Sequence, residues 1–258
     1  MINLSRAFKA FEAYVSHYDK NEPSIFLKYH HTYEVVKISE TLCGWLHLNE
    51  EDTHLAMLIG LLHDIGRFEQ YRIYHSFIDH QTIDHALFSS ELLFEKGLIR
   101  DFIEEDQYDE IIRISIEQHN KYKIDKIDDD RIMKFVYIIR DADKLDNFRV
   151  KEEEEIETLF NISQSDLEKE YICDQVYDQF MNHELIYKLN RETHLDMWIS
   201  YIAFIYDLHF NESLFYVYEH DWVDRLFRRI QPIDQRYNEL WRCMKNYVSE
   251  KIGSSRSI

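Results

Sequence analysis

The spacing of apolar residues along the chain predicts helices almost throughout. From Tyr29 to about His47, the apolar positions form one helical stripe, made of Val35, Ile38, Leu42 and Trp45. The next predicted helix is strongly apolar and runs to Leu62, with Thr53 as its expected N-cap. We expect Gly66 to end this helix, because glycine readily adopts the left-handed conformation that closes many helices.

A polar stretch rich in Tyr, His and Asp follows, which we predict to be a loop as far as Asp84. Helices are then predicted from near His85 to Glu95, closed by Gly97, and from about Gln107 to His119. A further helix, apolar enough to be buried, is predicted to run as far as Asp143. The first half of the chain is therefore expected to be a bundle of helices.

Beyond about Asn161 the spacing stays helical and the chain becomes strongly aromatic, with no internal repeat and no low-complexity linker. We expect residues 1–160 to form a helical core and residues 161–258 to form a helical extension packed on it, as one structural unit. Aromatic residues at helical spacing are mainly core residues. A wall beside the substrate or a homodimer face is the alternative.

Composition strengthens the prediction of an all-α fold. The 258 residues include only 5 Gly and 2 Pro, whereas an average chain carries about 12% of these two residues. Sheet-rich folds use glycine and proline in tight turns, so a sandwich, barrel or propeller is excluded. With 45% hydrophobic residues, the chain has ample material for a packed core.

Targeting signals are not evident in the sequence. No apolar run approaches the roughly 20 residues of a membrane helix, and the first residues lack the apolar core of a secretory signal. The chain has three scattered cysteines, Cys43, Cys173 and Cys243. This spacing indicates neither a disulfide framework nor a cysteine-based zinc site, so the expected location is the reducing cytoplasm.

The charge balance limits the expected partners. Lys and Arg number 30 and Asp and Glu 49, which gives a formal net charge of −19. An acidic surface repels nucleic-acid backbones, whose binding depends on Lys and Arg, so neither a polymeric nucleic acid nor a membrane is expected. A small phosphorylated compound would need a local source of positive charge, and the 14 His suggest a metal site as that source.

Histidine and aspartate recur at the ends or on the apolar faces of the predicted helices. His31 lies four residues before Val35, and Asp143 lies four residues after Ile139, so each shares an inward helical face. Buried imidazoles and carboxylates are costly unless they are paired or bind a metal. Six residues on different helices are therefore candidate metal ligands: His31, His63, Asp64, His85, His119 and Asp143.

Taken singly, each of these residues is a weak signal, because a histidine near a helix end is usually a cap or a surface residue. His30 competes with His31 as the ligand of its helix. His75 and His80 lie in the same predicted loop as His85 and could replace it.

Three segments resemble the signature of the HD-domain metal-dependent phosphohydrolase superfamily: residues 31–36 (HTYEVV), 61–67 (LLHDIGR) and 141–146 (DADKLD). The resemblance covers roughly residues 25–150. It implies an all-helical HD-domain bundle in which one metal ion is held by His31, His63, Asp64 and Asp143. Residues 161–258 show no such resemblance.

Two further histidines resemble those of the binuclear branch of the superfamily. In that branch, His85 and His119 would hold a second ion and Asp64 would bridge the two. Nitrogen and oxygen ligands suit Fe, Mn, Zn, Ni or, less well, Mg, so one or two such divalent ions are the expected cofactor. Two ions a few ångströms apart lower the pKa of a bridging water and hold a phosphoryl group during in-line attack.

Two basic residues adjoin the predicted ligands. Arg67, three residues after Asp64, could bind a phosphate through its forked guanidinium, or it is a surface residue. Lys144, next to Asp143, could do the same or pair with a nearby aspartate. Asp64, Arg67 and Lys144 are therefore the predicted catalytic residues.

The expected function is hydrolysis of a phosphomonoester or phosphodiester in a small compound, a nucleotide by preference, through a metal-bound hydroxide. Residues 143–149 (DKLDNFR) resemble the motif of alarmone hydrolases, but Arg67-Phe68-Glu69 replaces the Glu-Asp pair of those mononuclear enzymes. The Gly-Tyr-Pro element of cyclic dinucleotide phosphodiesterases does not occur, and their His-His pair is not matched at His119, which is followed by Asn120. The alternatives are a di-iron oxygenase of HD type and a non-catalytic metal-binding or nucleotide-binding regulatory module.

Overall fold

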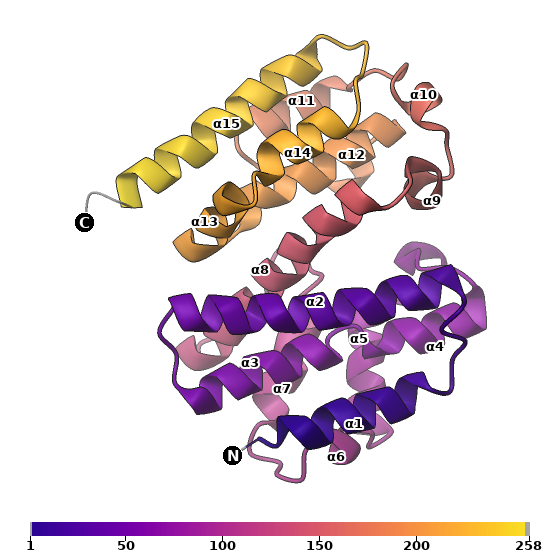
Figure 1. The fold of residues 1–258 in the computed structure, drawn as a ribbon, viewed down its shortest axis with the longest axis vertical. Helices are drawn as coiled ribbons and strands as arrows, with labels where there is room; N and C mark the ends of the chain where they lie inside the picture. The colour runs from indigo at the N-terminus through magenta and orange to yellow at the C-terminus, as the bar shows by residue number, and fades with distance from the viewer. Residues whose placement is uncertain (1, 256–258) are drawn as a thin grey trace. The chain divides into compact units, whose positions relative to one another are not determined.

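The described part of this computed structural model, residues 2–255, contains helices and turns and no strand, which confirms the predicted all-α fold (Figure 1). The chain divides into two compact units, Met1–Asp143 and Lys144–Ile258. The division falls inside helix α8 (Asp130–Glu153), whereas the sequence suggests a change of character at about residue 160. That the two parts form one structural unit stays a prediction.

The first unit consists of short and medium helices and one long complete helix, α2. Helix α2 packs along α3, and α5 packs against both α4 and α7 (Figure 1). The elements before α8 are α1 (Leu4–Val15), α2 (Pro23–Trp45), α3 (Glu50–Leu62), α4 (Ile65–Tyr74), the 3-10 turn η1 (Asp79–Gln81), α5 (His85–Ser90), the π-helical turn η2 (Glu91–Glu95), α6 (Ile99–Phe102) and α7 (Asp109–Gln118).

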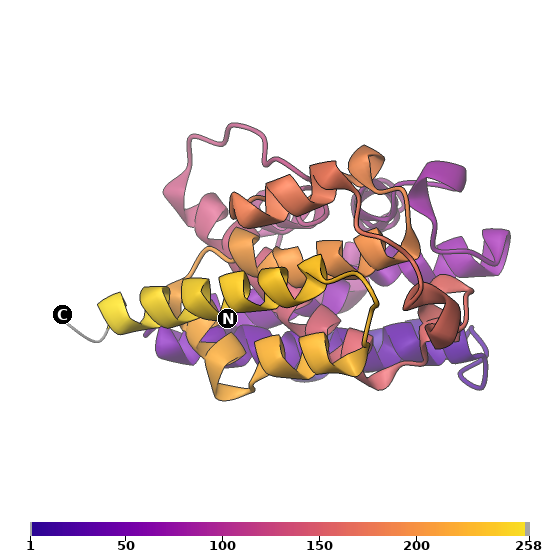
Figure 2. The same ribbon diagram turned by 90° about the horizontal axis from the view of Figure 1, so that it is seen from above.

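The second unit is built around the C-terminal helix α15 (Arg236–Ser255), which packs against α11, α13 and α14 (Figure 2). Trp198, Phe180 and Phe227 are fully buried, as expected for aromatic residues at helical spacing. A homodimer face in this region stays a prediction. The other elements are α9 (Ile156–Phe160), α10 (Gln164–Leu167), α11 (Asp174–Met181), η3 (Lys188–Asn190), α12 (His194–Ile202), η4 (Ala203–Asp207), α13 (Asn211–Glu219) and α14 (Trp222–Arg229).

Helix α3 begins earlier than the sequence predicts. Its N-cap is Asn49, whose side chain accepts a hydrogen bond of 2.8 Å from the backbone N–H of Asp52, so the assignment of Thr53 as the cap is wrong. The acidic residues Glu50, Glu51 and Asp52 occupy the first turn, where they interact favourably with the positive end of the helix dipole. Asn49 is a stronger cap than threonine in general, which accounts for the difference.

Gly66 does not end a helix. Helix α3 stops at Leu62 and α4 starts at Ile65, so Gly66 lies inside α4, and the loop predicted up to Asp84 is helical as far as Tyr74. By contrast, Gly97 has a φ of +79° after the turn η2, as a closing glycine should. The chain therefore passes from α3 into α4 through the dipeptide His63-Asp64.

Gly66 instead allows a close contact between α4 and α5. A Cβ atom at this position would lie 2.8 Å from the backbone nitrogen of Ser89 and 2.9 Å from its Oγ. The backbone N–H of Gly66 also donates a hydrogen bond of 2.9 Å to that Oγ. The same Cβ atom would lie 3.2 Å from the carbonyl oxygen of His85, so the start of α5 also lies close to the start of α4, next to Asp64.

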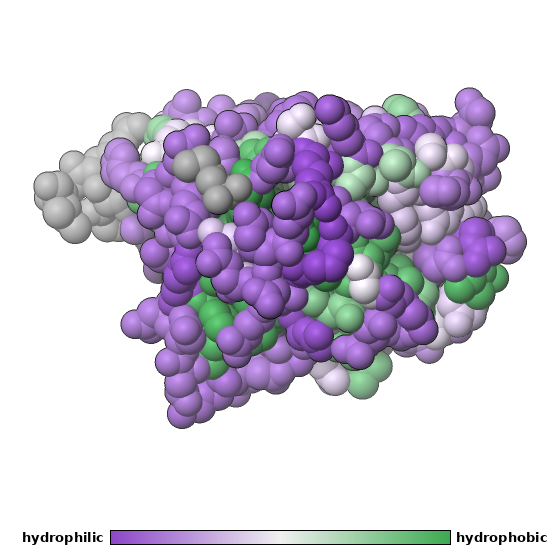
Figure 3. Space-filling model, turned by 90° about the horizontal axis from the view of Figure 1, so that it is seen from below, coloured by the Kyte–Doolittle hydropathy of each residue, from purple (hydrophilic) through white to green (hydrophobic). Residues whose placement is uncertain are grey.

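The molecular surface is mainly hydrophilic on the face shown in Figure 3, with apolar side chains in small, separated groups. None of the described helices is both long and apolar enough to traverse a lipid bilayer.

We predict that Gly66→Ala destabilises the protein, because the added methyl group overlaps backbone atoms of Ser89 that cannot move aside alone. The free energy of unfolding should fall by about 1–3 kcal/mol in urea denaturation. Gly44→Ala is the matched control, since no atom lies within 4 Å of a Cβ there. In this helical position alanine should stabilise by about 0.5 kcal/mol, and equal effects of the two changes would contradict the close contact.

Candidate metal centre

All six predicted ligands come together in the first unit. His31 lies within α2, His63 caps the end of α3, and Asp64 follows in the break before α4. His85 is the first residue of α5 and His119 caps the end of α7. Asp143 lies in α8 and has a partly exposed side chain, whereas the other five residues are buried.

The ligand atoms form two groups that share Asp64. One group consists of His31, His63 and Asp64, and the other of Asp64, His85 and His119. Within each group, one atom from each residue lies within 4.8 Å of the others. Asp143 Oδ1 adjoins the first group, at 3.1 Å from His31 Nε2 and 3.9 Å from His63 Nε2.

The hydrogen bonds of the histidine rings leave their Nε2 atoms available as ligands. His63 Nδ1 lies 2.7 Å from the carbonyl oxygen of Gly60, and His119 Nδ1 lies 2.7 Å from that of Ile116. His85 Nδ1 lies 2.6 Å from a carboxylate oxygen of Asp79. Because these oxygens only accept, each Nδ1 carries the proton and each Nε2 carries a lone pair.

The lone pairs face one another without a proton between them. His85 Nε2 and His119 Nε2 are 3.1 Å apart, although neither can donate. His63 Nε2 and Asp64 Oδ1 are buried and make no hydrogen bond. Electron-rich atoms at such distances repel unless a cation binds them, so the donor set fits divalent metal ions of the kind that imidazole and carboxylate prefer.

The local pKa shifts keep these groups in the protonation state that metals require. Burial lowers the pKa of His63, and burial together with the neighbouring imidazoles of His85 and His63 lowers the pKa of His119 to about 3. Burial alone would raise the pKa of Asp64, but Lys28 and the nearby imidazoles lower it well below its usual value. Burial alone would also raise the pKa of Asp143, but the neighbouring imidazoles, with His31 first among them, hold it far below normal.

Comparison with known protein families agrees with this geometry. The family model described as HD domain matches residues 29–147, a segment that contains all six residues. The chain carries an HD domain. HD domains are in general metal-dependent phosphohydrolases, and the His and Asp clusters described above could hold the metal. No curated protein and no solved structure matches the chain.

The other histidines considered as ligands, His30, His75 and His80, are not part of the two ligand groups. His30 is exposed, its ring stacks on Phe26, and its Nε2 lies 3.5 Å from Glu34. His75 and His80 are also exposed. The geometry therefore favours His31 and His85 as the ligands of their segments.

The two basic residues predicted beside the ligands are held by carboxylates. Arg67 Nη1 lies 2.8 Å from Asp79 Oδ1 and 2.9 Å from the carbonyl oxygen of Phe77, while its Nε is 3.6 Å from Asp64 Oδ1. Lys144 Nζ lies 3.0 Å from Asp207 Oδ2, within the second unit. Contact of either residue with a substrate stays a prediction.

Lys28 is a site residue that the sequence analysis missed. Its Nζ lies 2.8 Å from Asp64 Oδ2, and its side chain is only 17% exposed. Lys28 precedes His31 by three residues, so the two share one face of α2. The predicted helix starts at Tyr29, one residue too late to include Lys28, whereas α2 starts at Pro23.

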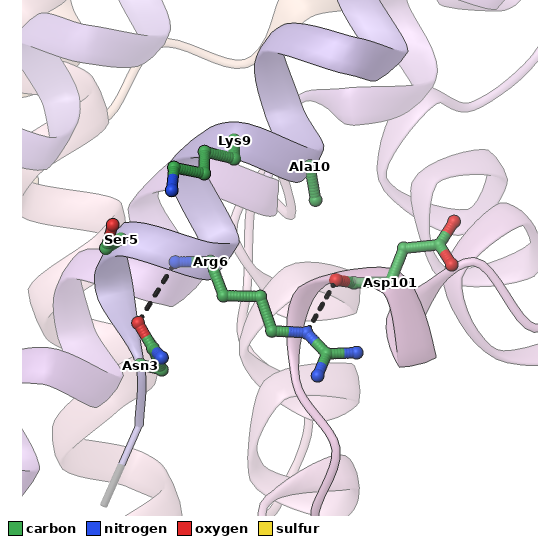
Figure 4. A pocket seen from close by; sticks show the side chains of 6 residues that line it. All are labelled: Asn3, Ser5, Arg6, Lys9, Ala10 and Asp101. Atoms are coloured by element: carbon green, nitrogen blue, oxygen red, sulfur yellow. Dashed lines mark hydrogen bonds between the residues drawn. The ribbon is translucent and has the colours of Figure 1, made fainter.

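A separate pocket of the first unit lies between α1 and the region of α6, and it has none of these ligands (Figure 4). Arg6 there donates from Nε to the carbonyl oxygen of Asp101 and from Nη2 to that of Arg100, and so binds the carbonyl end of α6. The pocket is lined by Asn3, Ser5, Arg6, Lys9, Ala10 and Asp101.

We predict that acid destabilises the chelator-treated protein through these histidines. Because the pKa of His119 in the folded protein is about 3, below its usual 6.5, the unfolded chain binds the proton more readily between these values. The stability is fully present above pH about 6.5 and is lost as the pH falls. Between pH 7 and 5, Tm should fall by roughly 5 °C more in the wild type than in His119→Gln. Differential scanning fluorimetry measures this, and parallel curves would contradict it.

Proposed function

We propose that the HD domain of this chain binds two divalent metal ions and hydrolyses a phosphoester bond in a small phosphorylated compound, a nucleotide by preference. The observation that carries the proposal is the pair of ligand groups that share Asp64. One carboxylate with two oxygens can bridge two ions only when ligands converge on it from both sides. His31 and His63 lie on one side, and His85 and His119 on the other.

The ligands divide into two positions in this proposal. His31, His63 and Asp143 would hold the first ion, His85 and His119 would hold the second, and Asp64 would be a ligand of both. When bound, such ions supply an activated water and the positive charge that neutralises a phosphoryl group. Their charge also offsets the repulsion between an anionic substrate and a protein of net charge −19.

Three cations are proposed to steady the anionic substrate, and their contacts differ. Lys28 lies closest to the shared carboxylate, at 2.8 Å from Asp64 Oδ2, so a phosphoryl oxygen bound beside Asp64 is within reach of its ammonium group. Arg67 and Lys144, proposed from the sequence, already make ion pairs with Asp79 and Asp207. Lys28 is ion-paired too, but its partner is the carboxylate that the two ions would share. Lys28 is therefore the preferred substrate contact, since phosphoryl transfer depends mainly on positioning and charge neutralisation.

An aromatic ring beside these cations supports a nucleotide as the substrate. The ring of Phe77 lies 5.6 Å from Lys28 Nζ and 5.6 Å from the guanidinium carbon of Arg67. A flat apolar surface next to a phosphate-binding cation can stack against a planar base. Which nucleotide is hydrolysed can be determined with a panel of substrates.

We predict that Asp64→Asn loses both metal and turnover. An amide cannot replace the charge of a carboxylate that two ions share, so metal content should fall from two equivalents to below one, and hydrolysis by at least about 100-fold. Elemental analysis of protein purified without chelator gives the first value. A panel of nucleotides and phosphoesters with Mn²⁺ or Fe²⁺ gives the second.

His30→Ala, at the exposed neighbour of His31, is the control and should keep both properties. A wild-type protein that holds metal but hydrolyses no phosphoester would refute the proposed activity and favour the regulatory module. Consumption of O₂ by the iron-loaded protein would instead favour the oxygenase.

We also predict that Lys28→Met lowers kcat/KM for the phosphorylated substrate by about 10- to 100-fold, the range expected for one lost charged hydrogen bond. The number of bound metal ions should not fall, because Lys28 is not a ligand. Lys37→Met removes a lysine from the same helix that is 66% exposed and pairs with Glu34, and it should leave kcat/KM unchanged. Steady-state kinetics on metal-loaded protein decide the matter, and equal kinetics for both variants would exclude Lys28 as a substrate contact.

A further inference from the structure

His85 differs from His63 and His119 in how its imidazole ring is held. His63 and His119 cap the C-terminal ends of α3 and α7, and each donates from Nδ1 to a carbonyl oxygen three residues earlier. The last carbonyl groups of a helix have no partner within the helix, so they are available to accept. A histidine at this end of a helix therefore finds an acceptor in its own backbone.

His85 has no such acceptor, because it lies at the opposite end of a helix. It is the first residue of α5, where the free backbone groups are N–H donors. Asp84 Oδ1 already accepts from the backbone N–H groups of Ala86 and Leu87 and from Asn120 Nδ2. An acceptor for the Nδ1 proton of His85 must therefore come from another segment, and it is Asp79 Oδ2, at 2.6 Å.

Asp79 is itself held in place by two side chains of α4. Its other oxygen, Oδ1, accepts from Arg67 Nη1 at 2.8 Å and from Gln70 Nε2 at 3.2 Å. Arg67 Nη1 also lies 2.9 Å from Gln70 Oε1, so the two holding side chains are bonded to each other. The carboxylate is thus fixed on one oxygen and orients the imidazole with the other.

Gln70 connects this network to the segment that carries Asp79. The residue is completely buried, and its Nε2 also lies 2.8 Å from Thr82 Oγ1 and 3.0 Å from the carbonyl oxygen of Ile83. Arg67 contacts the same segment through the carbonyl oxygen of Phe77. Residues 77–83 are therefore tied to α4 at both of their ends.

From these contacts we propose that Asp79, held by Arg67 and Gln70, is a positioning residue for the second metal ion. Asp79 fixes the proton of His85 on Nδ1 and directs Nε2 towards Asp64 and His119, at 3.4 Å and 3.1 Å. Arg67 acts through Asp79 and His85 in this arrangement. The inference rests on the proposed two-metal function and assigns a role to residues that do not touch the ions.

Metal titration tests this role without relying on activity. Chelator-treated protein is titrated with Mn²⁺ in a calorimeter and with Co²⁺ by visible absorption. Asp79→Asn keeps the size of the side chain but removes its charge, so the second equivalent should bind about 10- to 100-fold more weakly, as for other residues that orient a metal ligand. The first equivalent should keep its affinity within about twofold, because Asp79 holds His85, which belongs only to the second group of ligands.

Two further variants distinguish positioning from substrate contact. Arg67→Met should also lower the affinity for the second metal equivalent, by about threefold to tenfold, because Asp79 then loses one of the two side chains that donate hydrogen bonds to it. If Arg67 only bound substrate, this variant would raise KM and leave both metal affinities unchanged. Asp84→Asn is the control for a carboxylate next to His85 that caps α5 and accepts from Asn120, because an asparagine oxygen can accept the same bonds and caps helices as well as aspartate does.

The wild-type titration separates failure of this inference from failure of the proposed function. A single equivalent in the wild type would overturn the two-metal site and the role of Asp79 together. Two equivalents in the wild type with unchanged second-site affinity in both Asp79→Asn and Arg67→Met would overturn only the role of Asp79. Thermal melts of each variant show whether it is folded, and the 22% exposed side chain of Asp79 favours folded variants.

Discussion

The buried carboxylate of Asp64 determines how the rest of the site is arranged. An unpaired charge in a protein interior is strongly unfavourable, so its surroundings must supply compensation. Lys28 and Arg67 lie next to it, and four imidazoles, from His31, His63, His85 and His119, surround its two oxygens. The helices of the first unit are therefore packed around one anion, and the metal ions proposed here would complete its neutralisation.

Helix polarity explains how the histidines around that anion are oriented. At the C-terminal ends of α3 and α7, free carbonyl groups orient His63 and His119 with no help from other side chains. At the N-terminal end of α5, the backbone offers only donors, so His85 depends on Asp79 and on the residues that hold Asp79. The same ligand type thus requires a longer chain of supporting side chains at one end of a helix than at the other.

The fold class and the six clustered residues could be predicted from sequence, because helical spacing places residues such as His31 and Asp143 on inward faces. Other features depend on contacts between distant segments. Glycine is the residue that commonly ends helices, but Gly66 lies inside α4, where it allows the close contact with Ser89 of α5. Asp79 lies in a stretch without periodicity, where nothing local distinguishes it from Asp84. Lys28 was missed for a simpler reason, namely an underestimated length of α2.

The burial of Gln70 has a consequence for how the site works. Both ends of its amide are engaged, the nitrogen by residues 79, 82 and 83 and the oxygen by Arg67, so the group cannot turn over without losing several bonds. The connection between α4 and α5 is then a rigid frame and not a moving flap. For the phosphoester hydrolysis that we propose, much of the cost of arranging dipoles around the phosphate would then be met during folding, which would leave little reorganisation for the reaction itself.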